Sequence, residues 1–172
     1  LERLANHLGD IGAICNDAAF ALMLAHCGTL REDVLRVAKA AFGHRLMMDR
    51  IVPGGVTADL HDSGPVKALT ARIRQRFPRL VELYDNTASL QNRTVSTGRL
   101  AADLARRFGA GGPIGRASGR TFDARKAPGY PPYGDLDFKM VKRENGDVDS
   151  RIWVRIDEVY ESLELIEQIV DR

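Results

Sequence analysis

The sequence predicts a mainly α, multihelical domain with a small irregular or β excursion before its last helix. Near both ends of the chain, apolar residues recur at alternating spacings of four and three, which is typical of a helix that buries one face. Between these regions, residues 113–134 are rich in Gly, Pro and Arg. Residues 137–148 then alternate briefly and reach the turn-forming pair Asn145 and Gly146. With 172 residues and 44% hydrophobic content, the chain is long enough for one domain with its own core.

The first predicted helix covers the opening "LERLANHLGDIGAICNDAAF" and has no obvious solvent face. Its apolar stripe consists of Leu4, Leu8, Ile11, Cys15, Ala18 and Leu22. A second row holds small residues, which predict close packing against another backbone: Ala5, Gly9, Gly12, Asn16 and Ala19. A third row holds His7, Asp10, Ile14 and Asp17. Its ionisable groups are either buried and charge-paired, which would suit them to proton transfer, or part of a partly exposed polar edge.

A second helix is predicted to begin at Thr29. In "TLRE", Glu32 follows Thr29 by three residues, which is the spacing of a capping box. The apolar residues that continue this helix are Leu35, Ala38, Phe42 and Leu46. The helix is expected to end before Pro53–Gly55.

A third helical run is predicted to break at Pro78, because proline lacks the N–H that a helix interior needs. The run before the break carries Val66, Leu69, Ile73 and Phe77, and the run after it carries Leu80, Leu83, Tyr84 and Leu90. A short fourth piece is predicted to start at a Thr97 cap, to carry Leu100, Leu104 and Phe108, and to stop at Gly109.

The last segment is predicted to be helical without interruption. Its stripe consists of Ile152, Ile156, Val159, Leu163, Ile166 and Val170. The chain therefore divides into a helical part over 1–112, an Arg/Gly/Pro-rich loop with a short β element over 113–148, and a final helix over 149–172.

Composition excludes several classes of function. A formal charge of +2 is too balanced to argue for nucleic acid or an anionic membrane surface as partner. No apolar run approaches the roughly 20 residues of a membrane span. Cys15 and Cys27 lack C-x-x-C spacing and lie in helical patterns, so we expect buried, inert thiols in a reducing compartment. The four histidines show no zinc-site spacing.

The stretch "GAGGPIGRASGR" resembles a phosphate loop only superficially. It has no G-K-[ST], and a helix precedes it where a strand is required, so the P-loop and dinucleotide-binding interpretations both fail. What remains is a loop lined by Arg116, Arg120, Asp123, Arg125 and Lys126. These charges either form ion pairs within the loop or face a partner.

Four segments resemble the large subunits of membrane-bound, energy-converting NiFe hydrogenases, in particular the formate hydrogenlyase type. They are "ERLANHLGDIGAICNDAAF", "FGHRLMMDRIVPGGV", "GPIGRASGRTFDARKAPGYPPYG" and "GDVDSRIWVRIDEVYESLELI", in the same order as in that family. The motif R-x-S-G-x-x-x-D-x-R, here Arg116 to Arg125, is the most specific of these landmarks. The chain is also similar to the quinone-site subunit of respiratory complex I, so the resemblance implies the multihelical large-subunit fold.

The resemblance implies that this chain is the central part of a longer large subunit. In the family, two C-x-x-C pairs outside this region supply four thiolates to nickel, and Cys15 and Cys27 match neither pair. We therefore expect residues 1–172 to bind no metal or cofactor and to be inactive alone. The parent would hold a Ni-Fe centre, with an iron–sulfur cluster in a partner small subunit.

The resemblance also implies partners and a location. The partners are the iron–sulfur small subunit and membrane-arm subunits, with no nucleic acid. The location is the cytoplasmic side of the inner membrane, where the parent is a peripheral subunit. An isolated chain is expected to expose apolar surface and to self-associate.

The resemblance also implies candidate site residues, at the positions of this chain that match positions in the two families. Asp17 corresponds to an aspartate that pairs with an upstream histidine at the quinone site, and His7 and Asp10 are further candidates for a proton relay. A second group is expected to face the cluster-bearing partner: Arg116, Ser118, Asp123 and Arg125. Met47 and Val52 depart from the complex I pattern, which has His and Arg at these positions.

Three functions stay open at this point. The parent is a hydrogenase passing electrons between an iron–sulfur cluster and protons or H2, a quinone-site subunit of an NADH:quinone oxidoreductase, or a cofactor-free scaffold. Metal content and the flanking C-x-x-C pairs would discriminate between them.

Overall fold

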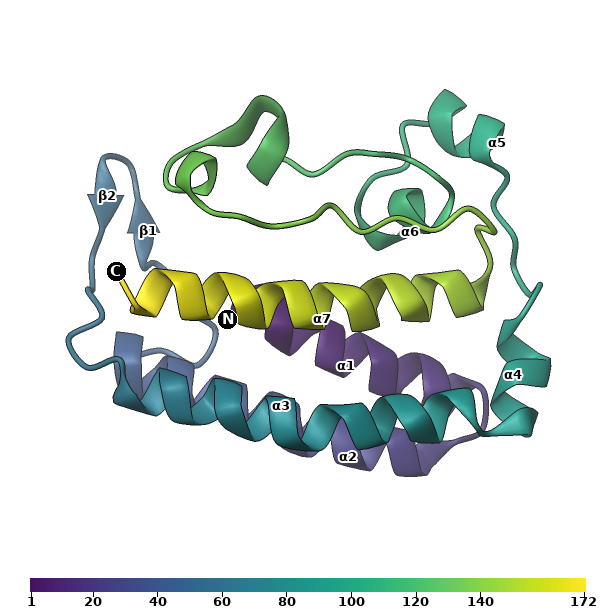
Figure 1. Ribbon diagram of the computed structural model, residues 1–172, viewed down its shortest axis with the longest axis horizontal. Coiled ribbons are helices and arrows are strands. Elements are labelled where there is room, and N and C mark those ends of the chain that lie inside the picture. Colours follow the sequence, from purple (N-terminus) through teal and green to yellow (C-terminus); the bar gives the residue numbers. More distant parts are fainter.

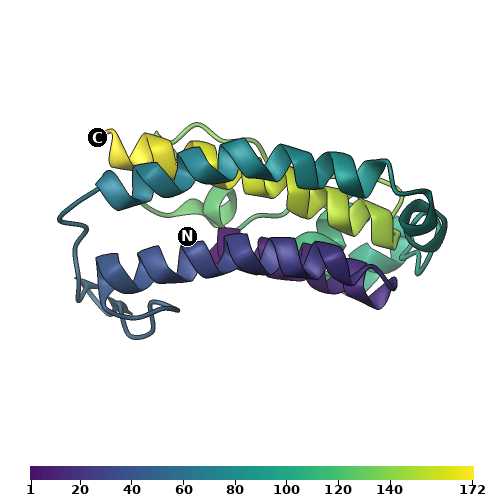
Figure 2. The same ribbon diagram turned by 90° about the horizontal axis from the view of Figure 1, so that it is seen from below.

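Four long helices lie roughly along one axis in the computed structural model, which describes residues 1–172 (Figures 1 and 2). They are α1 (Glu2–Asp17), α2 (Ala21–Phe42), α3 (Gly64–Asp85) and α7 (Val148–Val170). Their apolar stripes meet in one core, which includes the fully buried Leu8, Ile73 and Leu163. The predicted fold class, mainly α and multihelical with a small irregular or β excursion before the last helix, is confirmed. None of the helices combines the length and the apolar character that crossing a membrane requires.

The junction of α1 and α2 lies earlier than predicted. α1 ends at Asp17 because Ala19 takes a positive φ of 63°, which breaks the helix before Leu22. α2 begins at Ala21, so the predicted start at Thr29 is wrong. The Thr29 hydroxyl donates to the carbonyl of Ala25 within the same helix instead of capping it.

Gly12 confirms the close packing predicted from the row of small residues. A Cβ at Gly12 would lie 3.0 Å from the Cβ of Cys27 and 3.0 Å from the Cα of Leu24. Cys15 and Cys27 are both buried and free. The small residues of α1 therefore let α2 approach along the buried face.

α3 runs without interruption through Pro78, so the predicted break is wrong. Residues on both sides of the proline pack against α7. The ring centroids of Phe77 and Tyr160 lie 5.5 Å apart, and those of Tyr84 and Trp153 lie 6.1 Å apart. Tertiary packing of this kind outweighs the local preference against proline.

Residues 88–94 form a short helix beside the end of α3, and residues 95–147 form a layer of short helices and loops that covers α7 on the side away from α3 (Figure 1). The short helices are α4 (Ala88–Thr94), α5 (Ala102–Arg107) and α6 (Gly112–Ala117), followed by a π-helical turn, η1 (Arg125–Gly129), and a 3₁₀ turn, η2 (Tyr133–Asp135). α5 begins after Ala101, so Thr97 is not its cap, whereas Gly109 does follow its end with a positive φ of 62°.

The small sheet lies elsewhere than predicted. Strands β1 (Ile51–Val52) and β2 (Gly55–Val56) pair antiparallel around the Pro53-Gly54 turn. Residues 137–147 contain no strand. Gly146 instead joins two segments of the loop layer, since its N–H donates to Ala117 and its carbonyl accepts from Leu100. A side chain at Gly146 would collide with the Leu100 carbonyl, so glycine is required there for packing and for a φ of 71°.

Candidate functional site

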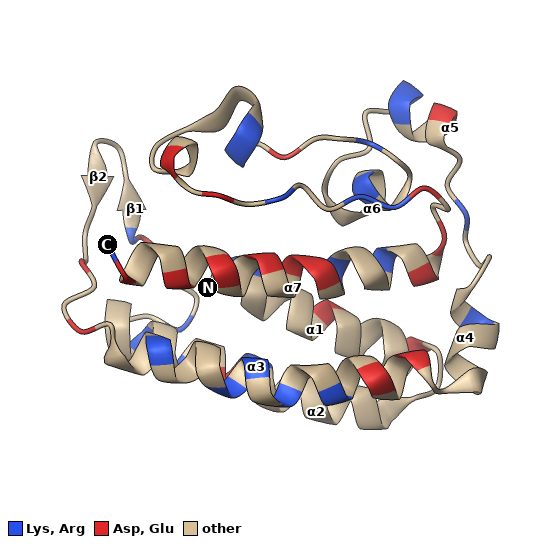
Figure 3. Ribbon diagram, viewed as in Figure 1, with Lys and Arg blue, Asp and Glu red and all other residues tan.

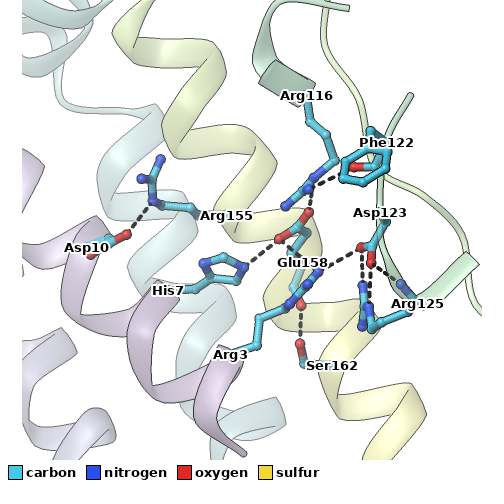
Figure 4. A network of polar contacts seen from close by, with 10 residues as sticks. All are labelled: Arg3, His7, Asp10, Arg116, Phe122, Asp123, Arg125, Arg155, Glu158 and Ser162. Atoms are coloured by element: carbon cyan, nitrogen blue, oxygen red, sulfur yellow. Dashed lines mark hydrogen bonds and ion pairs between the residues drawn. The ribbon is translucent and has the colours of Figure 1, made fainter. Parts of the chain in front are cut away.

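Glu158 of α7 lies at the centre of a buried polar network between α1, α6 and α7 (Figure 4). This residue is only 2% exposed. One carboxylate oxygen, Oε2, lies 2.5 Å from Nε2 of His7, and the other, Oε1, lies 2.5 Å from Nε of Arg116. Nη1 of Arg3 is 3.7 Å from Oε2. Three basic groups, two from α1 and one from α6, therefore surround one buried carboxylate.

The surroundings of Glu158 keep it ionised. Burial alone would raise the pKa of this carboxyl, but the hydrogen bond from His7 and the charge of Arg116 lower it below the ordinary value. Since an ionised carboxylate only accepts, the shared hydrogen belongs to Nε2 of His7. The other ring nitrogen, Nδ1, is buried and has no partner within the chain. His7 thus has one nitrogen bound to Glu158 and one without a hydrogen-bond partner in the chain.

A second ion cluster surrounds Asp123 of the R-x-S-G-x-x-x-D-x-R motif. Arg125 donates from Nε (3.0 Å) and Nη2 (2.7 Å), and Nη1 of Arg3 donates at 2.9 Å. Burial would raise the pKa of Asp123, but the hydrogen bonds from Arg125 and Arg3 lower it well below the ordinary range. The Arg125 guanidinium also lies 4.6 Å from the ring centre of Phe138. Arg3 joins this cluster to Glu158.

The motif side chains point inward. Arg116, Ser118 and Asp123 are all buried, and the Arg125 side chain is nearly so. Arg116 donates from Nη1 to the Phe122 carbonyl at 3.2 Å. Ion pairing within the loop is thus present, and the same residues also reach α1 and α7. A direct role of these side chains in contacting a partner stays a prediction.

A cleft of about 530 Å³ opens beside the network, between α1 and the segment around α6. His7, Arg116 and Asp123 lie on its wall together with Asp10 and Arg155. Nε of Arg155 donates to Oδ2 of Asp10 at 2.9 Å, and Asp10 is the most exposed of these groups. His7 and Asp10, three residues apart on α1, therefore line the same cleft, as the sequence predicted for one face of the helix.

Asp17 lies apart from this network. It is exposed at the last turn of α1, ten residues beyond His7. At 1.5 Å per residue, that places it about 15 Å along the helix axis. The structure therefore separates Asp17 from the pair His7 and Asp10, although their spacing put all three in one row.

The two thiols do not form a metal site. Burial raises the pKa of Cys15 to about 11. It is also the main reason that the pKa of Cys27 is raised to about 12. No group of three or more His, Cys, Asp or Glu side chains is arranged to hold a metal ion.

Glu158, Arg3 and Arg155 were missed by the sequence analysis. Glu158 carries a recoverable signal, because it lies in a second row of the last helix with otherwise small or apolar residues: Val154, Ser162 and Leu165. A lone acid in such a row requires a buried basic partner. Nothing in the sequence pairs Glu158 with His7, which lies 151 residues away.

Comparison with known proteins places the chain in a family. The family "Respiratory-chain NADH dehydrogenase, 49 Kd subunit" matches residues 17–172. The chain is 34% identical over 99% of its length to an NADH-quinone oxidoreductase subunit of Phocaeicola vulgatus, of which it covers 33%. It is 33% identical over 99% of its length to an F(420)H(2) dehydrogenase subunit of Methanosarcina mazei, of which it covers 46%.

A formate hydrogenlyase subunit is similar to this chain to nearly the same degree. The chain is 32% identical over 99% of its length to formate hydrogenlyase subunit 5 of Escherichia coli, of which it covers 30%. It spans about a third to a half of the length of these curated relatives. The family match extends over nearly the whole chain, from the end of α1 to the end of α7 and beyond it. The chain belongs to the family of the respiratory-chain NADH dehydrogenase 49 Kd subunit.

Proposed function

We propose that this chain is the central helical part of the large subunit of a membrane-bound NiFe hydrogenase of the formate hydrogenlyase type. The parent would pass electrons between an iron–sulfur cluster in a small subunit and protons or H2. Similarity to formate hydrogenlyase subunit 5 and to the carbon monoxide-induced hydrogenase of Rhodospirillum rubrum supports this proposal. So do Met47 and Val52, which stand where the quinone-site pattern has His and Arg.

The observation that carries the proton-transfer part of the proposal is the His7–Glu158 pair, because His7 itself lies on the wall of the cleft. Both proton reduction and quinone reduction consume protons, so either reaction needs groups that bring protons in from solvent. His7 has a free Nδ1 towards which a proton can be passed, and Asp10 lies three residues away at the cleft's exposed end. We assign proton transfer to His7 and Asp10. Asp17 serves separately, at the far end of α1, in coupling to the rest of the complex.

The metal centre of the parent does not fit the residues of this chain. Residues 1–172 contain no C-x-x-C pair, and Cys15 and Cys27 are buried with raised pKa values. The nickel centre would therefore be held by other parts of the parent, with no cofactor bound here and no turnover by this chain alone. Its partners would be the iron–sulfur small subunit and membrane-arm subunits, with the parent peripheral to the cytoplasmic face of the inner membrane.

A second function, the quinone-site subunit of an NADH:quinone oxidoreductase, is favoured by the family match itself and by relatives that are NADH-quinone oxidoreductase subunits. In that case the same helices form one wall of a quinone pocket. The buried network would then supply protons to a reduced quinone rather than to a metal centre.

Metal analysis of the full-length subunit, purified with its small-subunit partner, separates these functions. About one nickel per large subunit by mass spectrometry is the result expected for a hydrogenase. Iron without nickel would overturn that assignment. Quinone-dependent turnover of the same preparation would then establish the second function, and its absence would leave a scaffold.

A further inference from the structure

The surface of α5 carries an apolar face that nothing in the chain covers. Leu104 and Phe108, four residues apart, are 41% and 74% exposed, and Ala105 is the only buried residue of this helix. Arg107 shares their face, because residues three and four apart are neighbours on a helix. Its guanidinium lies 5.6 Å from the centre of the Phe108 ring. The aromatic ring and the charge therefore lie close together, on a helix that lies at the edge of the molecule (Figure 1).

The segment around α5 carries a net positive charge. Residues 95–114 contain Arg99, Arg106 and Arg107 against the single acid Asp103, a net charge of +2 (3 − 1) that equals the formal net charge of the whole chain. None of the three arginines takes part in an ion pair. Figure 3 shows a basic and an acidic segment on α5, at a distance from the acidic residues of α7. The three guanidinium groups are thus available to carboxylates from another molecule.

We propose that the α5 surface, defined as Arg99, Leu104, Arg106, Arg107 and Phe108, docks an acidic segment of another subunit of the parent complex. The proposal rests on the proposed function only in requiring that the chain works within a multisubunit assembly. Carboxylates of the partner pair with the arginines while an apolar depression takes up Phe108. Arginine and aromatic residues are the types enriched at the centres of protein interfaces, and arginine binds carboxylates through two parallel hydrogen bonds.

A lipid surface fits this region less well. α5 has six residues, so it is about 9 Å long. Helices that lie in a bilayer interface have a large apolar face with Trp, Phe or Leu and an opposite face rich in Lys and Arg. Residues 95–114 contain no lysine and no tryptophan. The exposed apolar side chains at α5 itself, Leu104 and Phe108, lie within about one helical turn, which is the size of an anchor in a protein pocket.

The test uses the assembled full-length complex. Phe108→p-benzoyl-phenylalanine, irradiated in the complex, should crosslink to a segment of another subunit with a net negative charge. Arg106→Glu with Arg107→Glu should abolish this crosslink and weaken retention of that subunit about tenfold or more in co-purification. Lysine substitutions of the acids in the crosslinked segment should then restore both. The matched control is Arg76→Glu with Arg79→Glu, two exposed arginines of α3 without ion pairs.

Each other result overturns the proposal. Crosslinks confined to this chain, to a second copy of it or to phospholipid would identify a different occupant. Equal loss of the subunit in the α3 control would reveal a general charge effect. Nickel content and turnover are measured on the same preparations, so a complex without nickel refutes the hydrogenase assignment while the crosslink still decides the docking surface.

Discussion

Replacing Glu158 by Gln removes one buried charge while keeping the side-chain volume. Arg116 and His7 then face a neutral amide inside the protein, at positions where the carboxylate oxygens lie 2.5 Å from each. Removing one partner of a buried ion pair typically lowers the free energy of unfolding by about 3–5 kcal/mol. For a chain of this length, about 2–4 °C of melting temperature corresponds to each kcal/mol, so E158Q should melt about 6–20 °C lower.

Urea and thermal unfolding followed by circular dichroism measure this loss in the 172-residue chain. The control is Glu164→Gln on the same helix, whose side chain is 57% exposed and pairs with Arg74. Such surface pairs contribute about 0–1 kcal/mol, so this variant should unfold nearly as the unchanged chain does. If E158Q were no less stable than E164Q, the Glu158 network would not be a source of stability.

The same variant has a predicted pH dependence. The pKa of Glu158 is lowered in the folded state, so its contribution to stability is present above the ordinary glutamate range, about pH 4, and is lost as the pH falls through the folded pKa. The stability difference between the unchanged chain and E158Q should therefore shrink in acid. A constant difference from neutral pH down to about pH 3 would contradict the assigned ionisation.

Further outcomes are expected elsewhere in the molecule. Asp17→Asn in the full-length complex should lower turnover while assembly stays intact, and unchanged turnover would remove Asp17 from the mechanism. Gly12→Ala should destabilise by about 1–3 kcal/mol, because its Cβ would lie 3.0 Å from that of Cys27, and urea midpoints measure this. Cys15 and Cys27 should react with a disulfide reagent at about pH 8 only at the rate of global unfolding, since burial raises both pKa values; rapid labelling of the folded chain would disprove their burial. The isolated chain should self-associate through exposed apolar residues such as Ile51, which is 86% exposed, and a monodisperse monomer in light scattering would refute this.

The long helices could be predicted from sequence where one face is buried along its whole length. The stripe that contains Leu8 and the stripe that contains Leu163 both lie in the core as expected. Boundaries were predicted less well, because they depend on single backbone conformations. Ala19 ends α1 with a positive φ, which no residue preference signals, and the Thr29 pattern imitates a cap within a helix that tertiary packing extends.

The sequence predicted two separate parts of the site but not their combination. His7 and Asp10 lie together because helical spacing places them so, and Arg116 and Asp123 belong to one motif. The carboxylate that joins the two parts is Glu158, and its partners are set by the packing of α7 against α1 and α6, which no local pattern encodes. Asp17 shows the opposite error, because it was grouped with His7 and Asp10 but lies apart from them. A shared helix face does not imply a shared site when the residues are several turns apart.

The span of the network has a consequence for how this protein folds. Arg3 meets Asp123 across 120 residues, and His7 meets Glu158 across 151. Contacts of such separation form late, because the entropy of closing the intervening chain is lost before they contribute. α1 and α2 can pair early as neighbours, with Arg3 and His7 still hydrated. We therefore expect the ionic network, which connects residues near the two ends of the chain, to form last in folding. Mutations in it should mainly accelerate unfolding rather than slow folding.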